Sequence, residues 1–189
     1  MTGTASAPAP RLYLLQGAPA VGKLTLAREI ERRTGAIVVD NHLVNNAVFV
    51  PLGMGRGGEV ALEDTDALRA RVLDVVLEAT LAASASLSHV FTNWLLEDPG
   101  NHAHVGRLRD LAARRGARVV PVWMSASAEA LTARVASAGR AERSTLVDPV
   151  ILSEPLTRPE LPAPQDAVLL DLSTTAPSEA AEQLLTHLA

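Results

Sequence analysis

The first residues that could do chemistry form a short stretch of small side chains near the amino terminus. Residues 17–23 read Gly-Ala-Pro-Ala-Val-Gly-Lys, which fits the pattern G-x-x-x-x-G-K. In this pattern, small residues let backbone N–H groups curl around an anionic phosphate, and the start of the following helix adds a favourable dipole. The Lys23 ammonium can then reach the outer phosphates of a nucleotide. The alternative is an ordinary strand-to-helix turn.

Lys23 is the only lysine of the chain, although 17 side chains are lysine or arginine. Lysine carries a compact point charge on a flexible stem, whereas arginine presents a planar fork. A single lysine at this position therefore supports phosphate binding. The residues expected to contact the nucleotide here are Gly17, Ala18, Pro19, Ala20, Val21, Gly22, Lys23, Leu24 and Thr25.

Short apolar runs alternate with amphipathic segments along the chain, and this order predicts the fold. The predicted strands cover residues 11–16, 36–40, 88–93, 117–124 and 167–172. The predicted helices cover residues 23–33, 64–85, 103–115, 127–138 and 177–188, and a turn is predicted at residues 99–100. This alternation is typical of an α/β protein, and we expect a three-layer α/β/α sandwich around a five-stranded parallel sheet. Ligands of such sheets bind at the carboxyl ends of the strands.

Length and composition restrict the class of protein. The 189 residues are 48% hydrophobic, which suffices for the core of a single domain. A net charge of −4 and an aromatic content of 3% argue against a nucleic-acid partner, because such partners favour basic and aromatic surfaces. The lack of cysteine excludes disulfides, zinc–thiolate sites and thiol nucleophiles.

Residues 1–10 are predicted to be a disordered tail, and residues 11–189 a single domain. The tail lacks the positive and apolar segments of a signal peptide. No apolar run approaches the roughly 18–20 residues that cross a bilayer. We therefore expect a cytoplasmic protein with no membrane partner.

The loop departs from its most common form, because Leu24 follows the lysine where Ser or Thr is usual, and Thr25 comes one place later. With this feature the chain resembles the branch of P-loop kinases that contains the adenylate, shikimate and gluconate kinases and the chloramphenicol phosphotransferases. The resemblance covers the element order of residues 11–188. It implies a P-loop NTPase fold with a short lid at about residues 139–149, and it implies ATP and Mg²⁺. Thr25 would touch phosphate, and Thr25 and Asp40 would reach the ion through water.

Asp40 ends the second predicted strand, beside the loop end of the first. In kinases of the resembling branch that phosphorylate alcohols, an Asp at this place contacts the acceptor hydroxyl. A neutral hydroxyl needs a base to take its proton, whereas a nucleoside monophosphate arrives as an anion. We therefore interpret Asp40 as the catalytic base for an alcohol acceptor. The alternative is a carboxylate that caps the next segment or holds Mg²⁺ through water.

Four polar or aromatic residues near the predicted strand ends are candidate acceptor contacts. Asn41 and His42 follow Asp40 directly, and Asn93 and Trp94 stand where a standard ATPase carries a magnesium-organising Asp. Turn or capping roles for the first two, and a structural role for Trp94, are the alternatives.

Arg134, Arg140 and Arg143 lie on and just after the helix that follows the fourth predicted strand. In the resembling kinases this region forms the lid. The resemblance implies that Arg134 stacks on the adenine and that Arg140 or Arg143 contacts the transferring phosphoryl group. Plain surface arginines are the alternative. The predicted catalytic residues are thus Lys23, Asp40, Arg140 and Arg143.

The remaining charged candidates are interpreted as surface groups. Glu97 and Asp98 are expected to be solvated loop charges. His102 and His104 stand two apart at the start of a predicted helix, where they cannot face one metal ion, and are expected on the surface.

These features favour an ATP-dependent phosphotransferase with an alcohol acceptor. A nucleoside monophosphate kinase would need several arginines in residues 41–66, where only Arg56 occurs. A regulatory GTPase is excluded, because its guanine-reading N-K-x-D would need a second lysine. A nucleotide-binding protein without kinase activity remains an alternative.

Overall fold

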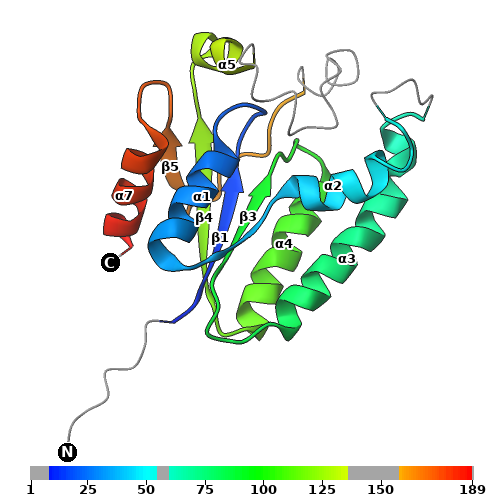
Figure 1. Ribbon diagram of the computed structural model, residues 1–189, viewed down its shortest axis with the longest axis horizontal. Coiled ribbons are helices and arrows are strands. Elements are labelled where there is room, and N and C mark those ends of the chain that lie inside the picture. Colours follow the sequence, from blue (N-terminus) through cyan, green and yellow to red (C-terminus); the bar gives the residue numbers. More distant parts are fainter. Residues whose placement is uncertain (1–8, 55–59, 136–157, 189) are drawn as a thin grey trace, which may run out of the picture.

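A sheet of five parallel strands forms the centre of the molecule (Figure 1). The computed structural model describes residues 9–54, 60–135 and 158–188. The strands are β1 (Arg11–Gln16), β2 (Ile37–Val39), β3 (His89–Asn93), β4 (Arg118–Ser125) and β5 (Val168–Asp171). Their order across the sheet is β2-β3-β1-β4-β5, so β1 is central, and all their carboxyl ends point to the top of Figure 1.

Helices cover both faces of the sheet. They are α1 (Lys23–Thr34), α2 (Asn41–Phe49), α3 (Asp66–Ala82), α4 (Pro99–Arg114), α5 (Ala128–Val135) and α7 (Pro177–His187). One core contains buried residues of α1 and α7, and a second contains buried residues of α3 and α4. The three-layer α/β/α arrangement predicted from the sequence is therefore confirmed.

The central strand shows why the strands are continuously apolar. Leu12 and Leu14 pack toward α3 and α4, whereas Tyr13 and Leu15 pack toward α1 and α7. All four are at most 1% exposed. Successive side chains of a strand point to opposite faces, so a strand covered on both faces needs apolar residues at every position.

Several predicted boundaries differ from the structure. The sequence predicted a turn at residues 99–100 and a helix from 103, but α4 already begins at Pro99. Asp98 caps this helix by accepting a hydrogen bond from the Asn101 N–H at 2.9 Å, and proline is well suited to the first helical position. Asp98 is thus a capping residue and not a solvated loop charge.

The segment after the second strand also folds differently from expectation. β2 ends at Val39, and Asp40 is the N-cap of α2. The long predicted helix at 64–85 is shorter, because a 3₁₀ turn at Glu63–Thr65 precedes α3. The end of the helix predicted at 127–138 and the predicted lid at 139–149 lie outside the described residues, as does most of the predicted tail.

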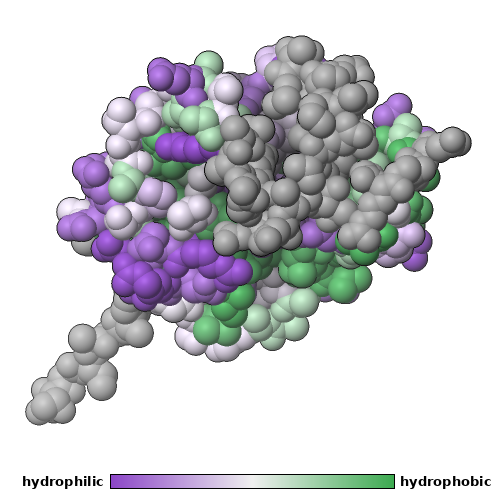
Figure 2. Space-filling model, turned by 45° about the horizontal axis from the view of Figure 1, so that its top comes forward, coloured by the Kyte–Doolittle hydropathy of each residue, from purple (hydrophilic) through white to green (hydrophobic). Residues whose placement is uncertain are grey.

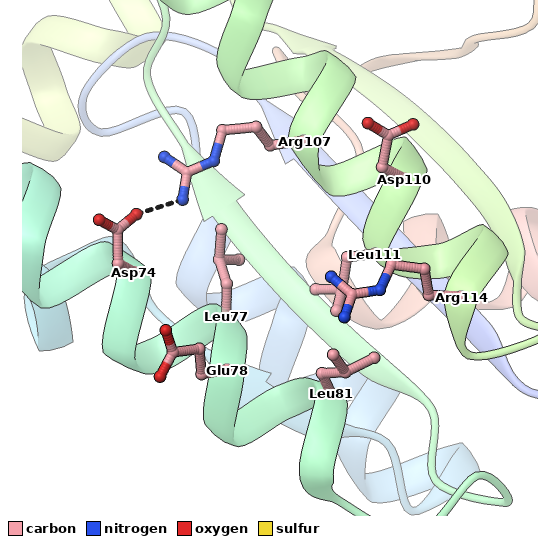
Figure 3. A pocket seen from close by; sticks show the side chains of 8 residues that line it. All are labelled: Asp74, Leu77, Glu78, Leu81, Arg107, Asp110, Leu111 and Arg114. Carbon is pink, nitrogen blue, oxygen red and sulfur yellow. Dashed lines mark hydrogen bonds and ion pairs between the residues drawn. The ribbon is translucent and has the colours of Figure 1, made fainter.

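Grooves between helices open on the surface away from the predicted site residues. A groove of about 430 Å³ lies between α3 and α4, where Arg107 pairs with Asp74 (Figure 3). Another, of about 380 Å³, lies between α2 and α3, and Figure 2 shows hydrophobic surface on that side. Neither contains a residue predicted for the site.

None of the helices in the described ranges is both long and apolar enough to span a bilayer.

Arg115 joins the end of α3 to the turn before β3. It is only 7% exposed, and its guanidinium donates to the carbonyl oxygens of Thr80, Ala83, Ser84 and Leu87. These carbonyls lie at and beyond the last turn of a helix, where the regular helical pattern supplies too few N–H donors. Thr80 O and Ser84 O each also accept one backbone N–H, from Ala83 at 3.3 Å and from Leu87 at 3.1 Å. One buried cation therefore satisfies four acceptors.

We predict that Arg115→Ala lowers the free energy of unfolding by about 2–4 kcal/mol, because it removes four hydrogen bonds to buried and partly buried carbonyl groups between α3 and β3. Urea unfolding measures the change. Arg114→Ala is the matched control, since Arg114 is exposed at the same helix end. It should change stability by less than about 0.5 kcal/mol, and equal effects of the two variants would refute the assignment.

Candidate functional site

The loop between β1 and α1 folds around the Lys23 side chain. Lys23 Nζ donates to the carbonyl oxygens of Gly17 at 2.5 Å and Ala18 at 2.8 Å. The backbone has positive φ at Ala20 (69°) and Gly22 (110°), which bends the loop back over the strand end. The ammonium is therefore held at the loop, beside the backbone that the pattern predicts to surround a phosphate.

Helix α1 begins at this loop without a side-chain cap. Gly22 is its N-cap, and no side chain accepts a hydrogen bond from the first turn. The first N–H groups of a helix lack intrahelical partners and carry the positive end of the helix dipole. Thr25 is exposed in this turn. The helix start is thus suited to an anion, as the sequence predicted.

Gly17 permits the loop to lie close to β4. A Cβ atom added at Gly17 would stand 2.4 Å from the carbonyl oxygen of Met124 and 3.1 Å from Val21 Cγ1. The first of these atoms belongs to the backbone and cannot move aside without shifting the strand. Glycine is therefore required here by space.

Asp40 follows the carboxyl end of β2, which β3 separates from β1, so it is not directly beside the end of the first strand as expected. It belongs to a small hydrogen-bonded group that we call the Asp40 cluster: Asp40, Thr92 and His42. Thr92 Oγ1 donates to Asp40 Oδ1 at 2.6 Å, and His42 Nδ1 lies 2.9 Å from Asp40 Oδ2. The backbone N–H of Asn41 donates to Thr92 Oγ1 at 3.0 Å. The cluster joins the start of α2 to β3.

The environment of Asp40 favours its ionised form. Burial alone would raise the pKa of Asp40, but the hydrogen bonds from His42 and Thr92 outweigh it and lower the pKa. The carboxylate is therefore charged at neutral pH. Its low basicity makes it a weak proton acceptor in the absence of substrate.

Asn93 and His104 form a second polar pair, on the α4 side of the sheet. His104 Nε2 lies 3.0 Å from Asn93 Oδ1, and Asn93 is 6% exposed. Burial, helped by the charge of Arg107, lowers the pKa of His104 to about 4, so the ring is neutral at pH 7. The prediction of a surface position is wrong for His104, because α4 packs this side chain against Asn93 at the end of β3. His102 is half-exposed and pairs with Glu97 at 2.8 Å.

Glu160 is a carboxylate near the candidate site that the sequence did not indicate. The segment at residues 159–161 pairs with residues 95–97, through Glu97 N to Pro159 O and Leu161 N to Leu95 O, both 2.9 Å. Burial raises the pKa of Glu160, while the charge of Lys23 and a hydrogen bond from Trp94 act in the opposite direction. Because this pairing crosses some sixty residues of chain, no local pattern could have indicated it.

Arg134 contacts the back of the phosphate-binding loop. Its guanidinium donates to Val21 O at 3.1 Å and to Leu172 O at 2.5 Å. These contacts bring α5 against the loop and against the segment after β5. Arg140 and Arg143 lie outside the described residues.

Comparison with known proteins shows the family and the fold. Residues 12–153 match the model of a protein family described as an AAA domain. No curated protein matches the chain.

Solved structures of kinases share the fold. A sugar kinase from a Janibacter species is 22% identical, with a TM-score of 0.59 over 96% of this chain and 95% of its own. APS kinase from Mycobacterium tuberculosis, solved with AMPPNP and APS, is 18% identical, with a TM-score of 0.59 over 96% and 99%. A gluconokinase from Sinorhizobium meliloti is 18% identical, with a TM-score of 0.56 over 97% and 95%. The resemblance to the P-loop kinase branch is thereby confirmed at the level of the fold.

We predict that Gly17→Ala lowers the free energy of unfolding by about 1–3 kcal/mol, because the methyl group clashes with β4. Distortion of the loop should also weaken nucleotide binding by about tenfold or more, which equals about 1.4 kcal/mol. Gly106→Ala is the control, because an added Cβ meets nothing within 4 Å there. This helix-interior change should stabilise the protein by about 0.5–1 kcal/mol, and a neutral Gly17→Ala would contradict the packing argument.

We predict that His104 makes the free energy of unfolding decrease as the pH falls. The folded-state pKa of about 4 lies below the value of about 6.5 expected for an unfolded chain. The unfolded state therefore binds more protons between these values, and stability is lost as pH falls from about 6.5 to about 4, by at most about 3 kcal/mol. Urea unfolding across this range should show a smaller loss for His104→Gln. The same change at His102 should leave the loss intact, and identical curves for all three proteins would rule out His104 as its source.

Proposed function

We propose that this chain, which belongs to the AAA domain family, is an ATP-dependent phosphotransferase that moves the γ-phosphate of ATP to a hydroxyl group of a small molecule. The shared P-loop kinase fold supports the general class of reaction. The observation that carries the finer assignment is a juxtaposition. The Lys23 loop, suited to phosphates, follows the carboxyl end of β1. The Asp40 cluster, suited to a hydroxyl, lies at the carboxyl ends of β3, which is next to β1, and of β2 beyond it.

On the donor side, the loop would bind the β- and γ-phosphates of ATP. Backbone N–H groups at the start of α1 would donate to phosphate oxygens. Lys23 would give up its hydrogen bonds to the Gly17 and Ala18 carbonyl oxygens and donate to the γ-phosphate instead. Its charge then stabilises the negative charge that spreads over the transferring group.

Magnesium fits this site as a companion of the nucleotide. Within the described ranges, no group of three His, Cys, Asp or Glu side chains is arranged to hold a metal ion. Mg²⁺ commonly keeps several waters and binds through substrate phosphates, so a protein cage is not required. When bound, it would neutralise charge on the β- and γ-phosphates. Thr25 and Asp40 would contact it through water at most.

On the acceptor side, the Asp40 cluster would receive the hydroxyl. An alcohol must lose its proton before or during transfer, whereas an acceptor phosphate is already ionised. A carboxylate with hydrogen-bonded neighbours at this strand end therefore favours an alcohol over a nucleoside monophosphate. Asn41, His42, Asn93 and Trp94 are proposed to line the acceptor pocket.

Three arginines complete the proposal. Arg134, which contacts Val21 and Leu172 behind the loop, would lie against the adenine. Arg140 and Arg143 are proposed to neutralise the transferring phosphoryl group. A cytoplasmic location remains a prediction from the sequence.

A screen for acceptor-dependent ADP release tests the proposal. Purified protein is incubated with Mg·ATP and each member of a panel of sugars, polyols, hydroxylated antibiotics and nucleoside monophosphates. Release of ADP with a hydroxyl compound would support the proposed reaction. Release with nucleoside monophosphates alone would favour that class of kinase. Nucleotide-dependent thermal stabilisation without any turnover would favour a nucleotide-binding protein that is not a kinase.

We predict that Lys23→Ala abolishes turnover and weakens ATP binding by about 100-fold or more, because a charge-assisted phosphate contact is worth about 3 kcal/mol. The fold should persist, since Lys23 belongs to none of the apolar core clusters of the described residues. Calorimetry measures binding, and circular dichroism checks the fold. Exposed Arg28, on the same helix, gives the control Arg28→Ala. Parental turnover in the Lys23 variant would refute the phosphate-binding role.

A further inference from the structure

We infer that His42 takes the proton of the acceptor hydroxyl and that Asp40 holds the His42 ring in position for it. This inference rests on the proposed function and deepens it. It differs from the sequence-based prediction, in which Asp40 takes the proton itself, and the experiment below separates the two.

Both oxygens of Asp40 already accept hydrogen bonds. Thr92 Oγ1 lies 2.6 Å from Oδ1, and His42 Nδ1 lies 2.9 Å from Oδ2. The Thr92 hydroxyl accepts the N–H of Asn41, so its own hydrogen is directed at Asp40. A substrate hydroxyl that donated to Asp40 would have to share an oxygen with these donors.

The same contacts fix which nitrogen of His42 can act as a base. A carboxylate only accepts hydrogen bonds, so the Nδ1 that faces Asp40 must carry a hydrogen. In the neutral ring the lone pair then lies on Nε2, the nitrogen at the far side from Asp40. This is the division of labour by which a carboxylate orients an imidazole base.

Exposure favours His42 as the group that meets the substrate. Its side chain is 42% exposed, compared with 20% for Asp40. His42 stands in the first turn of α2, three residues beyond the end of β2, at the carboxyl end of the sheet that also carries the phosphate-binding loop. Asp40 is therefore recessed behind the ring.

The transfer step balances with this assignment. The O–H bond of the acceptor breaks and its proton bonds to His42 Nε2, while the oxygen forms a bond to the γ-phosphorus. The bond between that phosphorus and the β,γ-bridging oxygen breaks, and ADP leaves with its electron pair. The resulting imidazolium is stabilised by the Asp40 carboxylate and later returns its proton to water.

The chain contains a matched pair for comparison. His102 Nε2 lies 2.8 Å from Glu97 Oε1, and these side chains are 54% and 42% exposed. This pair is also a histidine with a carboxylate, but it belongs to the loop before α4 and to that helix, and it is not proposed to contact substrate. It supplies the control variant.

The central experiment replaces each histidine by asparagine. In His42→Asn the amide nitrogen can occupy the place of Nδ1 and keep the hydrogen bond to Asp40, but no group remains that accepts a proton. Transfer is measured at saturating Mg·ATP, with water as the acceptor and with the hydroxyl compound that the screen identifies. We expect kcat to fall by about 10²–10⁴-fold, with ATP affinity changed less than about twofold. His102→Asn should keep parental kcat.

The Asp40→Asn variant distinguishes a failure of this inference from a failure of the proposed function. We expect it to lower kcat by a similar factor, and the double variant to fall no further than the worse single one, because the two groups act as a unit. If His42→Asn keeps kcat within about threefold while Asp40→Asn loses it, the inference is wrong and Asp40 is itself the base. If both variants keep kcat, the proposed alcohol acceptor loses its support.

A spectroscopic measurement tests the geometry without turnover. In protein labelled with ¹⁵N-histidine, neutral His42 should give the nitrogen shifts of the tautomer protonated at Nδ1, both alone and with AMPPNP. Asp40→Asn should reduce this preference. A parental His42 protonated at Nε2 would overturn the inference.

Discussion

The position of the candidate site depends on how Gln16 holds β1 to its neighbours. In the parallel register, Gln16 pairs with Asn93 of β3 on one side and with Trp123 of β4 on the other. Its buried side-chain amide continues the pairing, since Nε2 donates to Leu95 O at 3.1 Å and Oε1 accepts from Leu95 N at 2.9 Å. The side chain thus takes the place of the next strand residue. The main chain is free to leave the sheet at Gly17 and form the loop, while residues 93–95 stay attached beside it.

Two carboxylates of different character follow the carboxyl ends of the strands, Asp40 after β2 and Glu160 on the segment that pairs with the residues after β3. Hydrogen bonds from His42 and Thr92 lower the pKa of Asp40 despite its burial. Burial raises the pKa of Glu160, against the influence of Lys23 and Trp94. When environments push the pKa values of neighbouring groups apart, those groups take different chemical tasks. Asp40 is suited to remain ionised as the partner of His42. Glu160 lies close enough to Lys23 for the ammonium to act on its pKa.

The fold and the loop that carries Lys23 could be predicted because their signals are local. Short apolar runs between amphipathic segments indicated the strands, and the residues around Lys23 indicated the loop between β1 and α1. The start of α4 was missed because Pro99 and Gly100 were interpreted as a turn, although Asp98 and Pro99 together are also a helix start. His104 was misplaced for a different reason, since its partner Asn93 lies on β3, and only the packing of α4 against the sheet brings the two side chains together.

The acceptor side could be predicted only in part, for a physical reason. Asp40 was indicated by its place at a strand end, but its partner Thr92 is 52 residues away and became visible only through the β2–β3 pairing. The pairing of Glu160 with residues 95–97 depends likewise on contacts between distant segments. Sequence spacing identifies groups that share one helix or loop, whereas hydrogen bonds between strand ends are decided by the register of the sheet.

The charge of the nucleotide gives a reason for a recessed carboxylate behind a neutral base. A carboxylate that approached the acceptor directly would place a full negative charge next to the phosphates, and repulsion between like charges grows as their separation falls. A neutral imidazole avoids that repulsion in the ground state. As the proton moves to His42, a positive charge forms next to Asp40, so the attraction between the two groups rises during the step itself. Because interactions that strengthen toward the transition state are the ones that accelerate a reaction, the order Asp40, His42, hydroxyl uses the carboxylate's charge better than direct contact would.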